Sequence, residues 1–248
     1  AKVKRNTASG PDRIPSRIIR EFSYELATPL THVINSSFQQ NVVPDEWKRA
    51  IVVPIPKSNP PSVEKLRPVS LTDHFAKITE GFVAKWLIND IEPNLDQMQF
   101  GNRKTISTSH CIINVLHKVF VNSDKPKSSS TIVVTDFSKA FDRIDHTIAI
   151  TKLISLGVRP CIVPWIMSFL QSRQQCTRYR SVLSDWSMLQ AGVPQGTRLG
   201  PIIFLAMIND AAPPTGINAY KYVDDMTLVE CRTRDEPSNM QSAVTDLA

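Results

Sequence analysis

The stretch that decides the fold is Ala219-Tyr220-Lys221-Tyr222-Val223-Asp224-Asp225-Met226-Thr227-Leu228-Val229-Glu230. Apolar and β-branched residues lead into the two acids, and another such run leads out of them. This pattern predicts a β-hairpin with Asp224 and Asp225 at or beside its turn. Two adjacent carboxylates repel each other, and Mg²⁺ removes that repulsion because it prefers oxygen ligands. A solvated Asp-Asp turn is the alternative, so the metal hypothesis needs a third acid.

Residues 131–136 supply that acid. The run from Thr131 to Thr135 predicts a buried strand, and Asp136 follows it directly. An acid at the end of a buried strand is a common catalytic placement, although Asp also caps helices well. If the strand and the hairpin bring the three carboxylates together, they could bind two Mg²⁺ ions. Such a pair of ions holds the attacking and leaving oxygens in a phosphoryl transfer.

A glycine-punctuated loop lies between these two acidic segments, from Gly192 to Pro201, and it opens an apolar helix over 202–208. Glycines allow the backbone to approach a ligand closely, but a glycine loop alone is weak evidence for a site. Extended segments are predicted over 175–182 and 186–190.

The N-terminal half contains a basic pair of strands, predicted over 51–57 and 66–71. Prolines in the first strand indicate a sheet edge. The basic residues of this region are Lys48, Arg49, Lys57, Lys65 and Arg67. One interpretation is a solvated basic hairpin. The other is a fingertip that grips phosphates, with Arg67 as a bidentate clamp and Lys57 as a point charge.

Helical periodicity accounts for much of the remaining chain. It predicts a helix from Pro15 to Phe38 that Pro29 should kink or divide. Further helices are predicted over 73–90, 109–120, 146–156 and 160–171. The most polar stretch, residues 122–130, predicts an exposed loop.

Composition restricts the class of protein. The chain of 248 residues is 42% hydrophobic and 21% charged, which fits a soluble globular protein. A net charge of +6 favours a polyanionic partner. The four cysteines form no Cys-x-x-Cys pair, so neither a zinc site nor a disulfide framework is indicated. No apolar run reaches the ~20 residues of a membrane span, and no membrane association is expected. The chain begins with Ala, and we expect it to be a piece of a longer protein.

Taken in order, these features resemble the reverse transcriptase domain of non-LTR (LINE-type) retrotransposons, from Ser9 onward. The segments that match the family's motifs are Ser9–Pro15, Trp47–Lys57, Leu66–Thr72, Lys77, Glu80, Asp136–Asp142, Gly192–Pro201 and Tyr222–Asp225. The chain departs from the family over residues 101–108, where Thr105 and Ile106 replace a glycine and an arginine that are often found. Template contact is less expected there.

The resemblance implies an α/β (α+β) fold of the right-hand polymerase type. Residues 1–130 would be mainly fingers. Residues 131–248 would be mainly palm, with an antiparallel sheet packed on helices. The palm would be incomplete at its C-terminal end and the thumb would be missing.

The resemblance also implies the reaction, in which a primer 3′-hydroxyl attacks the α-phosphorus of a deoxynucleoside triphosphate. Asp136, Asp224 and Asp225 would be catalytic. Together with Phe137 they would hold two Mg²⁺ ions, for which Mn²⁺ could substitute.

The remaining site residues implied by the resemblance bind the nucleotide. Arg67 and Lys57 would hold the triphosphate, and backbone N–H groups at Lys139 and Ala140 could reach its oxygens. Phe141 would exclude a ribose 2′-hydroxyl by steric overlap, with plain core packing as the alternative. Gln195 and Gly196 would line the nucleotide and template side, and Tyr222 would also bind substrate.

The expected partners are an RNA template, a DNA primer and deoxynucleoside triphosphates. An intracellular location is expected, in a cytoplasmic ribonucleoprotein and in the nucleus, where the parent protein would prime on nicked chromosomal DNA. One alternative is an RNA-dependent RNA polymerase, but such enzymes tend to have a polar group in place of Phe141. The other is a decayed or domesticated copy that only binds RNA, against which the complete acid triad argues.

Overall fold

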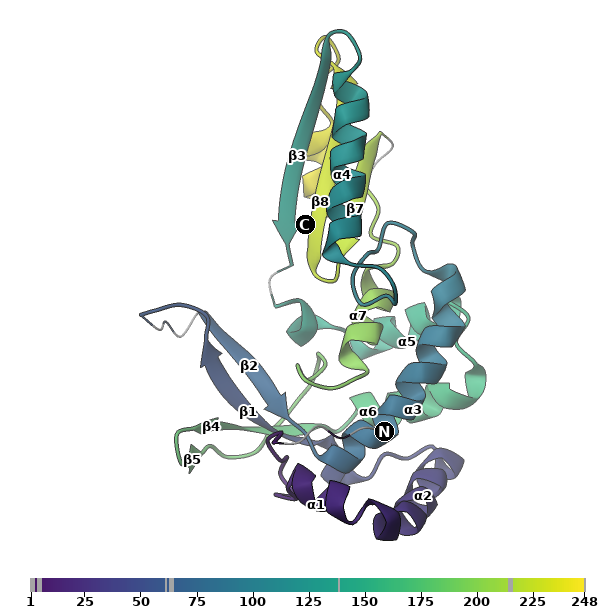
Figure 1. Cartoon of the computed structure of the whole chain (residues 1–248), viewed down its shortest axis with the longest axis vertical. Coiled ribbons are helices and arrows are strands. Elements are labelled where there is room, and N and C mark those ends of the chain that lie inside the picture. Colours follow the sequence, from purple (N-terminus) through teal and green to yellow (C-terminus); the bar gives the residue numbers. More distant parts are fainter. Residues whose placement is uncertain are drawn as a thin grey trace. The chain divides into compact units, whose positions relative to one another are not determined.

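The structure is a computed structural model that describes residues 3, 6–60, 62, 65–137, 139–213 and 216–247. The chain forms two compact units, shown in Figure 1, and each is built from two stretches of sequence. The first unit comprises residues 1–93 and 141–203, and the second comprises residues 94–140 and 204–248. This division into compact units does not say which residues are fingers and which are palm. The assignment of 1–130 to fingers and 131–248 to palm therefore stays a prediction.

The second unit is built on a three-stranded antiparallel sheet. Its strands are β3 (Ser128–Asp136), β8 (Asp225–Thr233) and β7 (Ile217–Tyr222), in the order β3-β8-β7. β7 and β8 form a hairpin whose turn is Val223-Asp224, which confirms the hairpin that the alternating sequence predicts.

Helices pack on both faces of this sheet. Met226 and Leu228 of β8 pack with residues of α8 (Met240–Asp246) on one face. Val229, the next residue along, lies in a second cluster on the opposite face, against the side of α4 (Thr108–Ser123). Figure 1 shows α4 running along the sheet. The expected antiparallel sheet packed on helices is therefore confirmed.

The first unit contains a five-stranded mixed sheet. The strands are β1 (Arg49–Pro56), β2 (Leu66–Leu71), β4 (Gln174–Tyr179), β5 (Val182–Leu183) and β6 (Ser187–Met188). β1 pairs with β2 antiparallel and with β4 in parallel, over 49–52. The expectation of an edge strand is wrong for that part of β1. Pro54 and Pro56 lie beyond the last β4 pair, so neither interrupts a ladder with β4.

Helices supply the rest of the first unit. They are α1 (Ser16–Glu21), α2 (Ser23–Gln40), α3 (His74–Ile91), α5 (His146–Ser155), α6 (Val163–Leu170) and the start of α7 (Gly200–Ile208). Short 3₁₀ turns cover Asp45–Lys48, Glu92–Asn94, Ala140–Arg143 and Pro160–Ile162. Among the described residues, no helix combines the length and apolarity needed to cross a membrane.

Aromatic packing forms part of this unit's core. Trp165 of α6 is 2% exposed, and its indole Nε1 donates to Ser37 Oγ of α2 at 2.9 Å. Its ring lies edge-on to Phe38, with the centroids 5.6 Å apart. These contacts fix α2 against α6.

Two boundaries differ from the sequence predictions. The first helical segment divides at Phe22, and Pro29 lies inside α2 without dividing it. Residues 128–130 are strand and not loop, because Ser128 to Ser130 pair with residues 231–233 of β8. The partner strand thus overrides the polar local composition.

Candidate active site

The three predicted acids lie at one end of the β3-β8-β7 sheet. Asp136 is the last residue of β3, and it is paired directly with Asp225, the first residue of β8. Asp225 is also paired with Tyr222, the last residue of β7. Asp224 occupies the turn between those strands. The sheet register therefore brings two acids from distant parts of the chain opposite each other, with the third next in sequence.

The charges of these acids act on one another. Partial burial and the negative charges of Asp224 and Asp136 raise the pKa of Asp225. Among the described residues, no three His, Cys, Asp or Glu side chains are already gathered as a metal site. The donors are nevertheless all carboxylate oxygens, and a divalent cation would relieve their repulsion. By donor chemistry and mutual charge, the triad fits Mg²⁺ or Mn²⁺.

The segment after Asp136 contributes backbone groups. The side chain of Phe137 packs on the apolar cluster beneath the hairpin. A phenyl ring has no N, O or S atom, so only the main-chain carbonyl of Phe137 could bind a metal. Lys139 is exposed, with a φ of +55°, and Ala140 begins a 3₁₀ turn. Ser138 lies outside the described residues.

Tyr222 is part of the hairpin's packing. Its side chain lies against the cluster of Phe100, Tyr220 and Val229 and is half-buried. Its predicted role in binding substrate stays a prediction.

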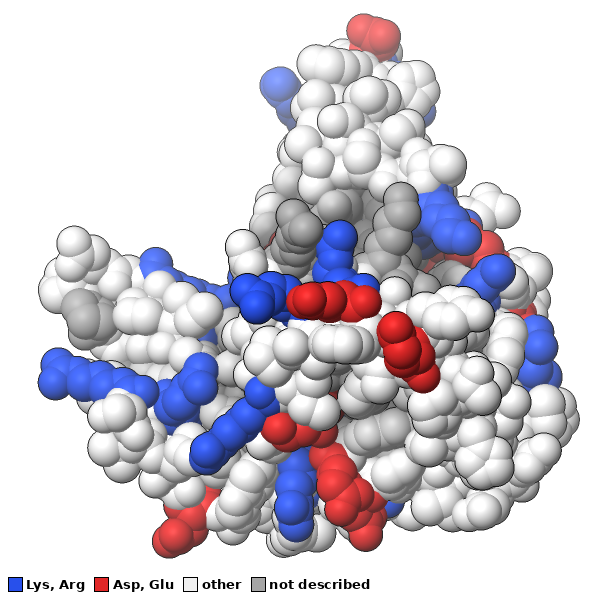
Figure 2. Space-filling view, turned by 60° about the horizontal axis from the view of Figure 1, so that its bottom comes forward, with Lys and Arg blue, Asp and Glu red and all other residues white. Residues whose placement is uncertain are grey.

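The basic strands belong to the first unit. Arg67 of β2 is paired with Ile55 of β1, and Lys57 comes directly after β1, two residues beyond Ile55. By the alternation of side chains along a strand, Arg67 and Lys57 share one face of this hairpin. Both are exposed. Figure 2 shows Lys and Arg side chains (blue) on the arm at the left, which Figure 1 shows to be formed by β1, β2, β4 and β5.

The glycine-rich loop is fastened to the same unit. The backbone N–H of Ser70 in β2 donates to the carbonyl of Gln195 at 2.8 Å. Gly196 has a φ of +123°, and a Cβ there would lie 2.7 Å from the Ser70 carbonyl oxygen. Val193 donates to the carbonyl of Phe141 at 2.9 Å, which ties the loop to the half-buried Phe141.

Comparison with known proteins decides the family. A family model described as reverse transcriptase (RNA-dependent DNA polymerase) matches residues 55–248. The chain belongs to the reverse transcriptase family. More specifically, it is a reverse transcriptase domain of the non-LTR, LINE type.

Several proteins from Drosophila melanogaster are similar to this reverse transcriptase domain. It is 30% identical over 220 residues to a probable RNA-directed DNA polymerase from transposon BS. It is 28% identical over 224 residues to the RNA-directed DNA polymerase from mobile element jockey. These alignments cover 87% and 88% of this chain but 24% of each relative. The domain therefore spans about a quarter of the length of the curated relatives it matches.

A solved structure supports the fold. The apo telomerase from Candida tropicalis, truncated from its C-terminal domain, superposes with a TM-score of 0.54 at 11% identity. The match covers 83% of this chain and 47% of the telomerase chain. At that identity the likeness shows the fold alone, and it agrees with the predicted fingers-and-palm fold.

Within the first unit of the reverse transcriptase domain, the glycine-rich loop borders a cavity of about 310 Å³. β2 contributes Pro68 and Ser70 to its wall. These two residues alternate with Arg67 and Val69 along β2, so they lie on the opposite face of the hairpin from Arg67. The structure therefore brings Gln195, but not Arg67 or Lys57, to this cavity.

Glu80 has a structural role that its place in a motif does not reveal. It is 2% exposed on α3, and its carboxylate accepts a hydrogen bond from the backbone N–H of Arg198 at 2.6 Å. Burial raises the pKa of Glu80, and the Arg198 and Leu199 backbone N–H groups and the Arg173 charge oppose that rise. Glu80 thus holds the loop just before α7 begins, where a helix favours negative charge. The sequence signal that could have revealed this role is the position of Glu80, an acid on the buried side of the helix predicted over 73–90.

Proposed function

We propose that this domain catalyses RNA-directed DNA synthesis, extending a DNA primer with deoxynucleoside triphosphates on an RNA template. The observation that carries the proposal is the pairing of Asp136 with Asp225, with Asp224 in the adjoining turn. The family match supports the reaction class.

In this proposal Asp136, Asp224 and Asp225 bind two Mg²⁺ ions, with Mn²⁺ as a substitute and the Phe137 main chain as a further ligand. When bound, these ions would stabilise the negative charge on the reacting oxygens of the primer and the triphosphate. The carboxylates hold their positions through the β-ladder, so their spacing is set before substrate arrives.

Residues of the first unit and of the Lys139–Phe141 segment bind the nucleotide in this proposal. Arg67 and Lys57 neutralise the triphosphate, and the main-chain N–H groups of Lys139 and Ala140 donate to it. Phe141 excludes the ribose 2′-hydroxyl. Gln195 and Gly196 line the nucleotide and template side, and Tyr222 also binds substrate.

The excess of basic residues supports nucleic-acid partners, since a net charge of +6 attracts polyanions. We assign the protein to the cell interior, first in a cytoplasmic ribonucleoprotein and then in the nucleus, where nicked chromosomal DNA offers a primer.

Primer extension on an RNA template with Mg²⁺ tests the proposal. Asp136→Asn should lower the extension rate by about 10²-fold or more, because it removes a preorganised charge at the reacting centre. Asp235→Asn, which changes an exposed acid beyond β8, is the matched control and should leave the rate unchanged.

Substrate choice separates the alternatives. The family match favours neither an RNA-dependent RNA polymerase nor a decayed copy. Extension with ribonucleoside but not deoxynucleoside triphosphates would support the first alternative. RNA binding without extension by any variant would support the second.

A further inference from the structure

The segment before α4 lies against the hairpin that carries Asp224 and Asp225, within the second unit. Phe100 donates its backbone N–H to the Lys221 carbonyl at 2.8 Å, and Lys221 donates its own to the Met98 carbonyl, also at 2.8 Å. Gln99 is therefore paired in parallel with Lys221, along β7. This backbone pairing fixes where the Gln99 side chain lies relative to the turn.

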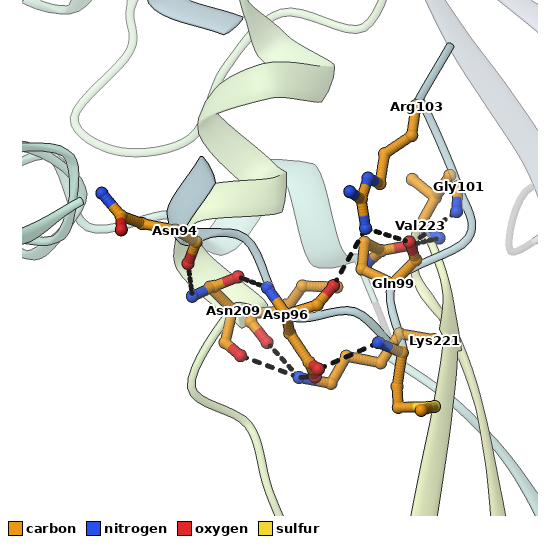
Figure 3. Close-up of polar contacts among 10 residues, drawn as sticks. Asn94, Asp96, Gln99, Gly101, Arg103, Asn209, Lys221 and Val223 are labelled. Carbon is orange, nitrogen blue, oxygen red and sulfur yellow. Dashed lines mark hydrogen bonds and ion pairs between the residues drawn. The ribbon is translucent and has the colours of Figure 1, made fainter. Parts of the chain in front are cut away.

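The Gln99 side chain reaches that turn. Its Oε1 accepts from the backbone N–H of Gly101 at 2.7 Å and from that of Val223 at 3.3 Å, as Figure 3 shows. Gln99 is 2% exposed, and its Nε2 has no hydrogen-bond partner among the described residues. The buried side-chain amide of Gln99 thus hydrogen-bonds to Val223, the residue directly before Asp224, while its own N–H donor stays unsatisfied.

Val223 needs such a restraint. Its φ is +60°, in the left-handed region, which is sterically unfavourable for a β-branched residue. A strained residue persists only where its surroundings hold it. The hydrogen bond that Val223 donates to Gln99 is one such restraint, because it fixes the backbone N–H of the strained residue itself.

Gly101 permits the close approach. A Cβ on Gly101 would overlap the amide nitrogen of Val223 and lie 2.6 Å from its Cγ2 atom. Only glycine leaves room for the segment and the turn to meet at this distance.

An ion pair between a buried lysine and a half-buried aspartate anchors the other end of the segment. Lys221 is 1% exposed, and its Nζ contacts Asp96 Oδ2 at 2.8 Å. The same Nζ donates to the carbonyls of Ile208 at 3.0 Å and Asn209 at 2.9 Å, where α7 ends. Asn209 in turn accepts from the Asp96 N–H at 2.7 Å, as Figure 3 shows. All the ammonium protons have partners, which makes the anchor rigid.

We propose that Gln99 is a positioning residue for the candidate active site. It fixes the backbone of the Val223-Asp224 turn and thereby the carboxylates of Asp224 and Asp225. The effect of Gln99 on metal binding depends on the proposed function. The effect of Gln99 on the Val223-Asp224 turn does not depend on it.

The test replaces Gln99 with methionine, which is similar in length but lacks the acceptor oxygen. Gln97→Met is the matched control, since Gln97 is exposed two residues earlier. The first readout is amide hydrogen exchange at Val223. The second is the binding of Mn²⁺ alone, followed by electron paramagnetic resonance.

In Gln99→Met, exchange at Val223 should accelerate at least about fivefold, the effect of losing a bond worth ~1 kcal/mol. Mn²⁺ affinity should fall by about tenfold, as for other residues that orient metal ligands. Adding Val223→Gly should recover part of that affinity, because glycine takes a positive φ without steric cost. A purely structural role for Gln99 would not give this recovery.

Two results would overturn the proposal. Unchanged exchange at Val223 would show that Gln99 does not hold the turn. Faster exchange with unchanged Mn²⁺ affinity would show that the hold does not position the carboxylates. If the unmodified protein bound no Mn²⁺, the proposed function would be contradicted, and exchange at Val223 alone would decide whether Gln99 fixes the turn.

Discussion

Asp136 lies directly opposite Asp225 in the β3–β8 ladder, as the final pair before the strands separate. Antiparallel pairing holds two like charges side by side at this point, where they destabilise the sheet unless something neutralises them. The placement is costly for stability and useful for binding cations, a combination that is common at functional sites.

Asp225→Asn should stabilise the protein when no metal is present. The charges of Asp224 and Asp136, with partial burial, raise the pKa of Asp225 above its unfolded-state value. The folded state therefore binds more protons than the unfolded state between the unfolded-state pKa, about 4, and the raised folded-state pKa, and stability falls as the pH rises through that window. At neutral pH we expect a melting temperature roughly 1–2 °C higher than that of the unmodified protein, and a smaller difference at about pH 4.

Scanning calorimetry in the presence of a chelator checks this prediction. Adding Mg²⁺ should then raise the melting temperature of the unmodified protein more than that of Asp225→Asn. Equal melting temperatures under all these conditions would mean that the three charges do not interact.

Asp73 should make the stability of the protein pH-dependent. Burial raises the pKa of Asp73 to about 6, a rise that the Asp12 charge adds to and the hydrogen bond from the Asp12 backbone N–H opposes. Because this value lies above the unfolded-state pKa, the stabilisation present at low pH is lost as the pH rises through about 6.

Asp73→Asn keeps the acceptor oxygen and removes the charge. We expect it to raise the free energy of unfolding at neutral pH by about 1–2 kcal/mol, and to do so much less near pH 4. Urea unfolding across this pH range measures the difference. A constant difference at every pH would show that Asp73 does not titrate in this window.

Glu80→Ala should strongly destabilise the first unit. The change leaves the Arg198 N–H and the buried Arg173 guanidinium without their acid, and such losses cost about 3 kcal/mol or more. Urea unfolding of Glu80→Ala should show this loss, whereas Glu46→Ala, at an exposed acid, should change stability by less than about 0.5 kcal/mol. Equal effects would mean that the carboxylate of Glu80 does not secure the loop before α7.

Phe141→Ala should relax the choice of sugar. If the ring excludes the 2′-hydroxyl, its removal should raise incorporation of ribonucleotides relative to deoxynucleotides by about tenfold or more. Single-nucleotide incorporation with each substrate gives the ratio, and Phe120→Ala, on the exposed side of α4, controls for general effects. An unchanged ratio would support core packing as the role of Phe141.

The order of apolar and polar residues along the chain predicted those elements that depend mainly on their own sequence. The hairpin followed from alternating apolar residues around Asp224, and the strand ending at Asp136 followed from a β-branched run. The prediction that this strand is buried was wrong, because Ile132 and Val134 of β3 are exposed. Non-local pairing decided the remainder. β1 is an interior strand over the residues that pair with β4. The polar residues 128–130 are strand because they pair with β8.

The same distinction applies to the candidate site. The three acids belong to motifs and could be named from the sequence. Gln99 could not, because its contact with Val223 joins residues that are 124 positions apart. The departures from the family pattern at Thr105 and Ile106 concern template contact, whereas Gln99 and Gly101, just before them, contact Val223 in the turn that carries Asp224.

The rate of deoxynucleotide incorporation on an RNA template, measured for the unmodified protein and Asp224→Asn over a Mg²⁺ titration, tests the central claim most directly. The account predicts Mg²⁺-dependent extension by the unmodified protein and a loss of about 10²-fold or more in Asp224→Asn. Extension at equal rates by both proteins would contradict the account, because the hairpin acids would then have no part in the chemistry.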